Sequence, residues 1–332
     1  MNLFTKAEFQ ENPAKINHKE RILTLGSCFA ENIGQKLVEN NLLTLCNPFG
    51  IIYNPSSICS CINRLYENAH ITTNELQLCQ DYYCHLDFHS QFNGIDKQAT
   101  LEGINQRILD TNTFVNEGLD WLILSLGTAF VYKYKLSGEY VNNCHKIPST
   151  EFERIQLTTS EMVEALSKSI LKLKKDHPSL KVILTVSPIR HIRDGLSANL
   201  RSKCRLIEAA HQLTEKLQQC YYFPSYEILI EELRDYRWYK EDLIHPNNQA
   251  VEYIWEHFKK FALDANSIEL IKKMKTIINN LNHKAFLTQS NQHQKFLRFT
   301  EDKIEHIEKE YPHLSFAKEK EMLAFKRKGI KG

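Results

Sequence analysis

The sequence predicts an α/β protein built on a mostly parallel sheet, and three observations indicate this class. Segments 120–127 and 180–187 are almost continuously apolar, which is typical of central strands buried on both faces. Segment 22–25 is a shorter apolar strand that runs directly into a helical pattern. Helical periodicity recurs between the strands, and this alternation implies parallel strands covered by helices. We therefore expect five strands in the order 2-1-3-4-5.

The elements of the first third follow from local signals. After the first helix, segment 42–46 is expected to be a short strand. Two prolines and a glycine over 47–55 indicate an ordered loop. Ser56 is expected to cap a helix whose apolar residues share one face. Alternating polar and apolar residues over 82–92 predict a half-buried strand.

The remaining elements are predicted in the same way, from helical spacing, apolar runs and turn residues. In order, they are a helix over 101–114, the strand at 120–127, a hairpin over 130–141 turning at Ser137-Gly138, a helix over 161–174, the strand at 180–187, a helix over 196–217, a strand at 221–223 and a helix from Asn247.

The first strand-to-helix turn holds the leading candidate for chemistry. Gly26 permits the sharp turn, and Ser27 then lies at the carboxyl end of a strand, where open α/β sheets bind ligands. Backbone N–H groups of Ser27 and Cys28, with the helix dipole, could stabilise an oxyanion. Ser27 could be a nucleophile or a helix cap, and the Cys28 thiol is a further candidate nucleophile.

Two motifs carry a resemblance to a known family. Gly26-Ser27-Cys28-Phe29-Ala30 resembles the signature for which the GSCFA family is named, and that family is similar to SGNH or GDSL-like hydrolases. Asp242-Leu243-Ile244-His245-Pro246 resembles the Asp-x-x-His block of those enzymes. The resemblance extends over about residues 20–262. It implies an SGNH-hydrolase-like three-layer fold and an esterase with Ser27, His245 and Asp242 as the catalytic triad.

The spacing within the second motif suits that role. A carboxylate three residues before an imidazole can accept from one ring nitrogen and leave the other facing the nucleophile. Ser27 would be the nucleophile, His245 the general base and then acid, and Asp242 the residue that orients it. Alternatively, Asp242 caps the following helix and His245 is a surface residue.

The oxyanion hole is less directly matched. SGNH hydrolases use a glycine after the second strand and an asparagine after the third, but here the third strand ends in Gly127-Thr128-Ala129. Gly50 is the candidate glycine, and either Asn143 or Thr128 is the side-chain donor. Asn143 is favoured because it lies in the polar run Asn-Cys-His-Lys, which also makes His145 a candidate for substrate binding. Alternatively, Asn143 and His145 are turn and rim residues.

The segment 187–195 follows a central strand and so belongs to the same edge of the sheet. Arg190 and Arg193 could hold an anionic group of the substrate, and His191 is both a substrate-binding candidate and a competing general base. The alternative is a structural loop in which Asp194 pairs with one of the arginines.

Composition limits the class of protein. The chain has 332 residues, a net charge of +2 and ordinary hydrophobic content, so we expect neither nucleic acid nor membrane as a partner. The first residues lack the apolar region of a secretory signal, and nine scattered cysteines suit a reducing, cytoplasmic compartment. Their spacing matches no tetrahedral zinc pattern, so we expect no metal, and the proposed chemistry needs no cofactor.

We expect two domains, an α/β domain over 1–262 and a helical extension over 263–332. Lysine-rich helices are predicted at 268–281 and about 292–310. Three phenylalanines should be buried against the domain or a neighbouring subunit, which would make a homo-oligomer through these helices: Phe286, Phe296 and Phe325. The chain is then a hydrolase of a small-molecule or carbohydrate ester, or a non-catalytic binding module that keeps the same cleft.

Overall fold

The computed structural model describes residues 5–7, 12–283, 290–312 and 314–327. Within it the chain divides into two compact units. The α/β unit contains residues from 1–16 and 20–262, and the helical unit contains residues from 17–19 and 263–332. Each unit is described by itself below.

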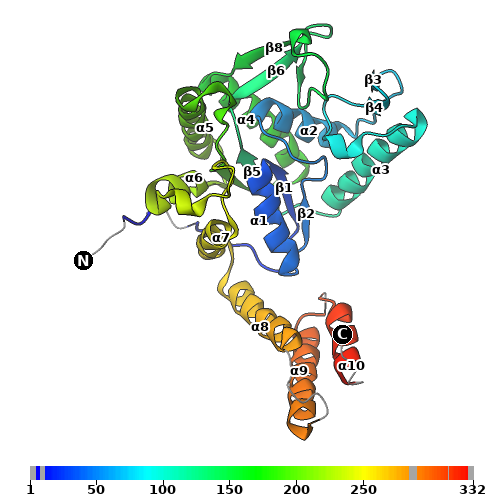
Figure 1. The fold of residues 1–332 in the computed structure, drawn as a ribbon, viewed down its shortest axis with the longest axis vertical. Coiled ribbons are helices and arrows are strands. Elements are labelled where there is room, and N and C mark those ends of the chain that lie inside the picture. Colours follow the sequence, from blue (N-terminus) through cyan, green and yellow to red (C-terminus); the bar gives the residue numbers. More distant parts are fainter. Residues whose placement is uncertain (1–4, 8–11, 284–289, 313, 328–332) are drawn as a thin grey trace. The chain divides into compact units, whose positions relative to one another are not determined.

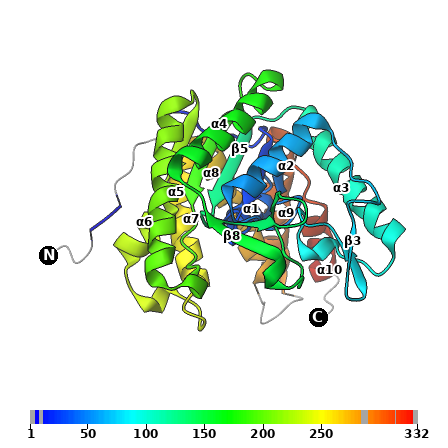
Figure 2. The same cartoon turned by 90° about the horizontal axis from the view of Figure 1, so that it is seen from above.

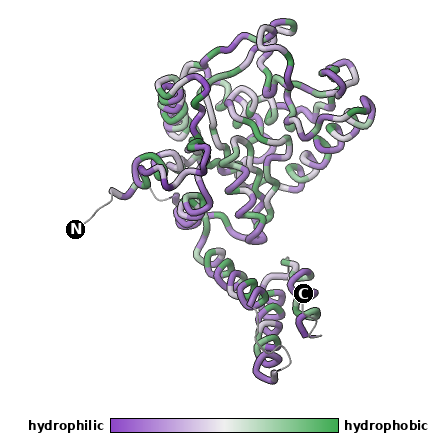
Figure 3. The backbone as a smooth tube through the Cα atoms, viewed as in Figure 1, coloured by the Kyte–Doolittle hydropathy of each residue, from purple (hydrophilic) through white to green (hydrophobic). Residues whose placement is uncertain are grey.

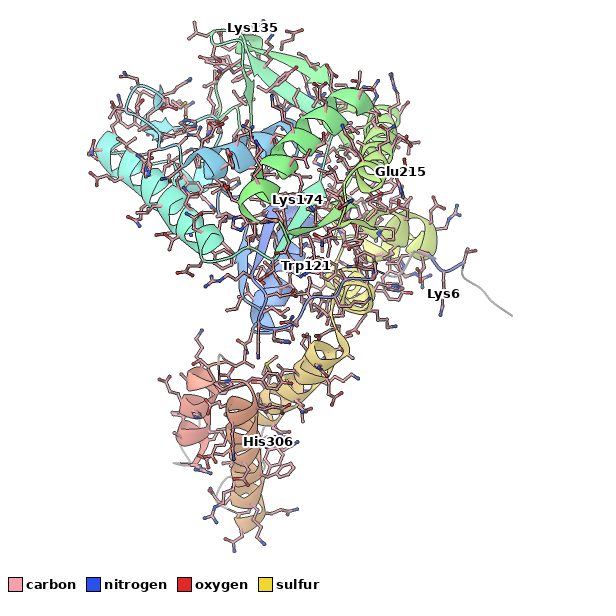
Figure 4. The ribbon with its side chains drawn as sticks, turned by 180° about the vertical axis from the view of Figure 1, so that it is seen from behind. Lys6, Trp121, Lys135, Lys174, Glu215 and His306 are labelled. Atoms are coloured by element: carbon pink, nitrogen blue, oxygen red, sulfur yellow. The ribbon has the colours of Figure 1, made fainter. Side chains whose placement is uncertain are left out.

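The α/β unit is built on a parallel five-stranded sheet (Figure 1). Its strands are β1 (Ile22–Gly26), β2 (Thr44–Cys46), β5 (Trp121–Leu126), β9 (Lys181–Val186) and β10 (Cys220–Phe223). Their order across the sheet is β2-β1-β5-β9-β10, so the predicted order 2-1-3-4-5 is confirmed. The three central strands are almost wholly buried, as their apolar sequences require, and Figure 4 shows fully buried Trp121 inside the unit.

Helices cover both faces of the sheet, which gives the predicted three layers. One face packs on α2 (Pro55–Glu67), α3 (Lys97–Asn116), α4 (Thr159–Asp176) and α5 (Leu196–Lys216), whose apolar residues join one core cluster with the strands. The other face packs on α1 (Cys28–Glu39) and α7 (Asn248–Ala262), which are linked by the Lys36–Glu252 ion pair at 2.8 Å. Phe258 of α7 lies edge-on to Phe223 of β10, with ring centroids 5.2 Å apart. Figure 2 shows this unit from above, with α3 and α5 at opposite sides.

Two smaller antiparallel sheets complete the unit. The predicted hairpin is formed by β6 (Phe130–Tyr134) and β7 (Tyr140–Val141), and Figure 4 marks Lys135 at its turn end. A strand that was not predicted, β8 (Phe152–Gln156), pairs with the other edge of β6. The second sheet joins β3 (Gln77–Cys79) to β4 (Tyr82–Cys84).

Two local predictions are wrong. The strand expected over 82–92 ends at Cys84, because the chain turns there and forms a short 3₁₀ helix at Ser90–Phe92. The cap of α2 is Asn54 rather than Ser56: its side chain accepts from Ser57 N at 2.9 Å, and Pro55 takes the first helical position. After β10, a short helix α6 (Ser225–Glu227) continues as a π-helical turn over Ile228–Leu233.

The helical unit contains α8 (Ala265–Asn282), α9 (Asn291–Glu310) and α10 (Ala317–Arg327). Figure 3 shows hydrophobic and hydrophilic residues alternating along these helices, and Figure 4 marks His306 on α9. Phe296 is half-buried but Phe325 is 46% exposed, so burial of Phe325 within this chain is not found, while Phe286 lies outside the described residues. Among the helices that the structure describes, none is long and apolar enough to cross a bilayer.

Candidate active site

The turn between β1 and α1 places Ser27 where the sequence predicts it. Gly26 has φ +141°, and a Cβ at this position would lie 2.3 Å from the carbonyl oxygen of Ser125 on the neighbouring strand, so only glycine fits. Ser27 then adopts an extended backbone conformation and caps α1, because its Oγ accepts from Phe29 N at 3.1 Å. Ser27 is therefore the N-cap of α1, and its role as a nucleophile stays a prediction.

The Ser27 side chain, directly after β1, is fully buried. Its Oγ lies 2.9 Å from the Ser125 Oγ, and its backbone N–H donates to the Ser125 carbonyl oxygen at 3.1 Å. The backbone N–H of Ser27, which was expected to stabilise an oxyanion, is thus already hydrogen-bonded to the neighbouring strand. The next N–H, that of Cys28, belongs to the first turn of α1, where helix geometry supplies no carbonyl partner, and its contact is with the Cys28 thiol itself.

The Asp242–His245 pair forms as the sequence predicts. Asp242 Oδ2 lies 2.7 Å from His245 Nδ1, and Oδ1 accepts from the backbone N–H groups of Ile244 and His245. These bonds, from His245 N first, lower the pKa of the Asp242 carboxyl to about 2. Since a carboxylate only accepts, Nδ1 carries the ring proton and Nε2 is left as a proton acceptor. Leu243, between the two, has φ +56°, a strained conformation that lets the short turn close.

The turn that carries this pair is hydrogen-bonded to the loop after β9, since Arg190 N donates to the Ile244 carbonyl oxygen at 3.3 Å. Lys240 N donates to the His245 carbonyl oxygen at 2.8 Å. Burial raises the pKa of the Cys28 thiol, while its hydrogen bond to Tyr53 Oη, at 3.8 Å, lowers it. Within the described residues, however, no hydrogen bond joins Ser27 to His245, whose side chain is 40% exposed.

His191, the competing base, lies in a different environment. Its ring packs edge-on against Tyr53, with centroids 5.5 Å apart, and its backbone N–H donates to Asn199 Oδ1 at 2.8 Å. In the described part of the chain, the buried Nε2 has no hydrogen-bond partner. Burial, followed by the charge of Lys203, lowers the pKa of His191 to about 3, so the ring is neutral near pH 7. No carboxylate among the described residues is hydrogen-bonded to its ring, in contrast to His245.

Lys203 joins the ends of two central strands from within the core. The side chain is fully buried on α5, and its Nζ donates to the carbonyl oxygens of Gly127 at 2.6 Å and Ser187 at 2.7 Å. Burial lowers the pKa of Lys203 to about 7. This lysine fixes the two loops that follow β5 and β9, and therefore also the segment that carries His191.

Asn47 performs a similar function between β1 and β2. Its Oδ1 accepts from Gly26 N and its Nδ2 donates to Glu31 Oε2, both at 2.9 Å. Its carbonyl oxygen accepts from Gly50 N at 2.8 Å. The Gly50 N–H, predicted to be an oxyanion donor, is therefore occupied in a tight turn, where the φ of +81° requires glycine.

The predicted side-chain donors have contacts away from Ser27, although for Asn143 the bonded atom is the amide oxygen rather than the Nδ2 donor. Asn143 Oδ1 accepts from His145 N at 3.1 Å, while the His145 Nε2 lies 2.9 Å from the His85 carbonyl oxygen. His145 is 5% exposed, and burial lowers its pKa. Thr128 Oγ1 lies 3.2 Å from the Ser202 Oγ. Within the described residues none of these groups bonds to Ser27, and the contacts of Asn143 and His145 favour the turn interpretation.

The arginines after β9 hold neighbouring loops. Arg190 Nη1 donates to the Leu243 carbonyl oxygen at 3.2 Å, which fastens the turn carrying Asp242 and His245. Arg193 Nη1 donates to Tyr132 Oη at 3.3 Å. Asp194, expected to pair with one of these arginines, instead forms a bidentate ion pair with Arg154.

Sequence reasoning missed four residues that shape the site: Asn47, Tyr53, Ser125 and Lys203. Ser125 is a polar residue near the end of an apolar strand, and Lys203 occupies an inward-facing position of its helix. Both residues could therefore have been singled out from the sequence pattern. The roles of Asn47 and Tyr53 depend on a loop conformation that spacing does not specify. Among the residues that the structure describes, no three His, Cys, Asp or Glu side chains are grouped to hold a metal ion.

Comparisons with known proteins identify the family. Residues 21–258 match the GSCFA family, and residues 274–325 match the GSCFA domain protein, C-terminal domain. No curated protein matches the sequence.

Two solved structures match this chain at low similarity. One, described as a platelet activating factor from Streptococcus pneumonia, has 14% identity and a TM-score of 0.38, with 75% of this chain and 86% of that chain covered. The other, an acetyl xylan esterase from the rumen bacterium Butyrivibrio proteoclasticus, has 12% identity and a TM-score of 0.36, with 79% and 67% covered. The family match alone spans more than half of the sequence, and the chain therefore belongs to the GSCFA family.

Proposed function

We propose that this protein is a serine hydrolase of an ester, either an O-acyl group on a carbohydrate or another small acyl ester. The observation that carries the proposal is the Asp242–His245 pair, in which Nδ1 is held by a carboxylate and Nε2 is available as a base. The turn that carries the pair is hydrogen-bonded to the loop after β9, because Arg190 N donates to the Ile244 carbonyl oxygen at 3.3 Å. His191 of that loop packs against Tyr53, which in turn contacts the Cys28 thiol beside Ser27.

The reaction needs three roles. His245 Nε2 takes the proton from the Ser27 hydroxyl as Oγ attacks the ester carbonyl carbon, and it then protonates the departing alcohol. Asp242 stabilises the imidazolium and keeps the reactive nitrogen directed at the nucleophile. Water repeats the sequence on the acyl-enzyme and releases the acid.

The proposal requires Ser27 to exchange partners. Its Oγ must leave the Ser125 Oγ and the Phe29 N–H and turn toward His245. The Cys28 N–H at the start of α1 is the donor best placed for the oxyanion, since those of Ser27 and Gly50 are paired.

One observation favours the alternative of a non-catalytic binding module. Ser27 is fully buried and serves as a helix cap, while two expected oxyanion donors are engaged in the fold. In that case the Asp242–His245 pair would stabilise its own turn and the cleft would bind without cleaving.

Labelling with a fluorophosphonate separates the two functions, because only an activated nucleophile is phosphonylated. Trypsin releases residues 22–36 as one peptide, which contains Ser27 and Cys28. We expect one adduct on this peptide in the wild type, none in Ser27→Ala and at least about 100-fold slower labelling in His245→Ala.

Cys28→Ala is the matched control and should be labelled like the wild type. Labelling that persists in Ser27→Ala but disappears in Cys28→Ala would make the thiol the nucleophile. An unlabelled wild-type protein would exclude the hydrolase and leave the binding module.

A further inference from the structure

The β3–β4 hairpin contains two cysteines whose sulfur atoms lie 2.8 Å apart. We propose that Cys79 and Cys84 form an intramolecular disulfide when the protein meets a disulfide oxidant such as glutathione disulfide, which makes this hairpin a reversible oxidation site. The proposal does not depend on the hydrolase function.

The hairpin register brings the two side chains together. Cys79 pairs with Tyr82 and Gln77 pairs with Cys84, so both cysteines lie on one face of the two strands as diagonal neighbours. A two-residue turn joins the strands, and Gln80 within it has φ +60°. Both thiols are free in the structure. Since a disulfide is about 2.05 Å long, the sulfur atoms need to approach by only about 0.8 Å.

The other closely spaced pair lacks this geometry. Cys59 and Cys61 are two residues apart on α2, and helical residues with that spacing do not face each other. In the described part of the chain, only the thiols of Cys79 and Cys84 are in hydrogen-bond contact with one another.

The reaction proceeds by two exchanges. One cysteine thiolate attacks a sulfur atom of glutathione disulfide, which forms a mixed disulfide and releases one glutathione thiolate. The second cysteine thiolate attacks the protein sulfur of that mixed disulfide and releases the second glutathione. The two protons lost by the cysteines are taken up by the two glutathione thiolates, so one disulfide is exchanged for another.

Burial controls the rate of this reaction. Cys79 is 6% exposed and Cys84 is fully buried, so Cys79 should react first. Burial, followed by the hydrogen bond to Cys79, raises the pKa of Cys84, and oxidation should therefore accelerate at alkaline pH. The exposed turn and the exposed Leu78 show that only one face of the hairpin is covered, and two-stranded hairpins are marginally stable.

The disulfide would act on neighbouring loops through existing contacts. Tyr83 exchanges backbone hydrogen bonds with Gly94 at 2.7 and 3.2 Å, and Tyr82 Oη donates to the His145 carbonyl oxygen at 2.8 Å. A covalent link across β3 and β4 would therefore restrain the segments around Gly94 and His145.

Peptide mapping tests the proposal directly. Trypsin releases residues 65–97 as one peptide with Cys79 and Cys84 as its only cysteines. After incubation of the native protein with excess glutathione disulfide at pH 8, this peptide should lose two hydrogen atoms, about 2 Da, and resist N-ethylmaleimide in denaturant. After reduction it should accept two maleimide groups.

Three variants serve as controls. Cys84→Ala should carry one glutathione on Cys79 instead of the 2 Da loss, whereas Cys79→Ala, whose remaining thiol is fully buried, should show neither the loss nor rapid addition of glutathione. Cys204→Ser removes an exposed thiol and should leave the loss unchanged. The proposal fails if the wild-type peptide keeps two free thiols while Cys204 is modified, carries two glutathiones, or is cross-linked to another peptide.

Discussion

Replacing Lys203 by methionine should remove a pH dependence of stability that this residue gives the protein. Methionine keeps most of the length and apolar stem of lysine but cannot bind a proton. The wild-type side chain is fully buried and its pKa is lowered by burial to about 7, from 10.5. Between pH 7 and 10.5 the unfolded chain therefore binds more protons at this position than the folded protein, and the free energy of unfolding increases as pH rises.

The size of the effect follows from linkage. One proton of difference changes the free energy of unfolding by about 1.4 kcal/mol per pH unit. Between pH 7 and pH 9, the folded form has released nearly all of this proton and the unfolded form has kept it. The free energy of unfolding of the wild type should thus increase by about 2 kcal/mol relative to that of Lys203→Met between pH 7 and pH 9. Below about pH 6, Lys203 is protonated in both states and the difference between the two proteins should become constant.

Urea unfolding at pH 6, 7, 8 and 9 measures this difference. The pKa of His191 is lowered chiefly by burial and its ring is neutral in the folded protein over this range, and groups away from Lys203 titrate equally in both proteins. The change of the wild-type-minus-variant value with pH therefore reports Lys203. The lost hydrogen bonds to Gly127 and Ser187 lower the stability of the variant by a pH-independent amount. Lys216→Met, at an exposed position of the same helix, should follow the wild type at every pH. Parallel curves for the wild type and Lys203→Met would refute the reasoning.

Three further substitutions test the surroundings of Ser27. Asn47→Ala should lower the free energy of unfolding by about 2 to 3 kcal/mol in urea, because it removes the bonds to Gly26 and Glu31 and places alanine at φ +39°. Ser125→Ala should accelerate fluorophosphonate labelling of Ser27 by roughly 3- to 10-fold, since it removes one neutral hydrogen bond of the buried hydroxyl, and unchanged labelling would show that Ser125 does not restrain it. Asn143→Ala should leave the labelling rate within about 2-fold, whereas a 100-fold loss would restore Asn143 as an oxyanion donor.

The sheet could be predicted because its signals are local and mutually consistent. Continuous apolar runs specify strands buried on both faces, and helices between them require right-handed parallel connections. The resulting order of strands places Gly26 and Gly127 at the carboxyl ends of two neighbouring strands. β8 was missed since the alternation in FERIQ is short, and its pairing with β6 depends on a partner distant in the sequence.

The site was predictable only in part. Asp242 and His245 are three residues apart, so their hydrogen bond depends on a single turn that the sequence encodes locally. The hydrogen-bond partner of the Ser27 hydroxyl could not be predicted in this way. Its two candidate partners, Ser125 and His245, are both distant from it in the sequence. Nothing in the spacing of these residues shows that a cap and a neighbouring strand take up the Ser27 Oγ.

The two reasons to question catalysis differ greatly in weight. Releasing the Ser27 Oγ from two neutral hydrogen bonds costs about 1 to 3 kcal/mol, which would slow an acyl transfer by about 5- to 150-fold. Each missing oxyanion donor costs about 100- to 1,000-fold, and the N–H groups of Ser27 and Gly50 are both paired. A buried serine is therefore compatible with an active hydrolase, whereas pairing of both these N–H groups leaves the oxyanion to the N–H of Cys28. The choice between an enzyme and a binding module rests on whether this one donor suffices or the backbone around Ser27 and Gly50 releases a second N–H group when substrate arrives.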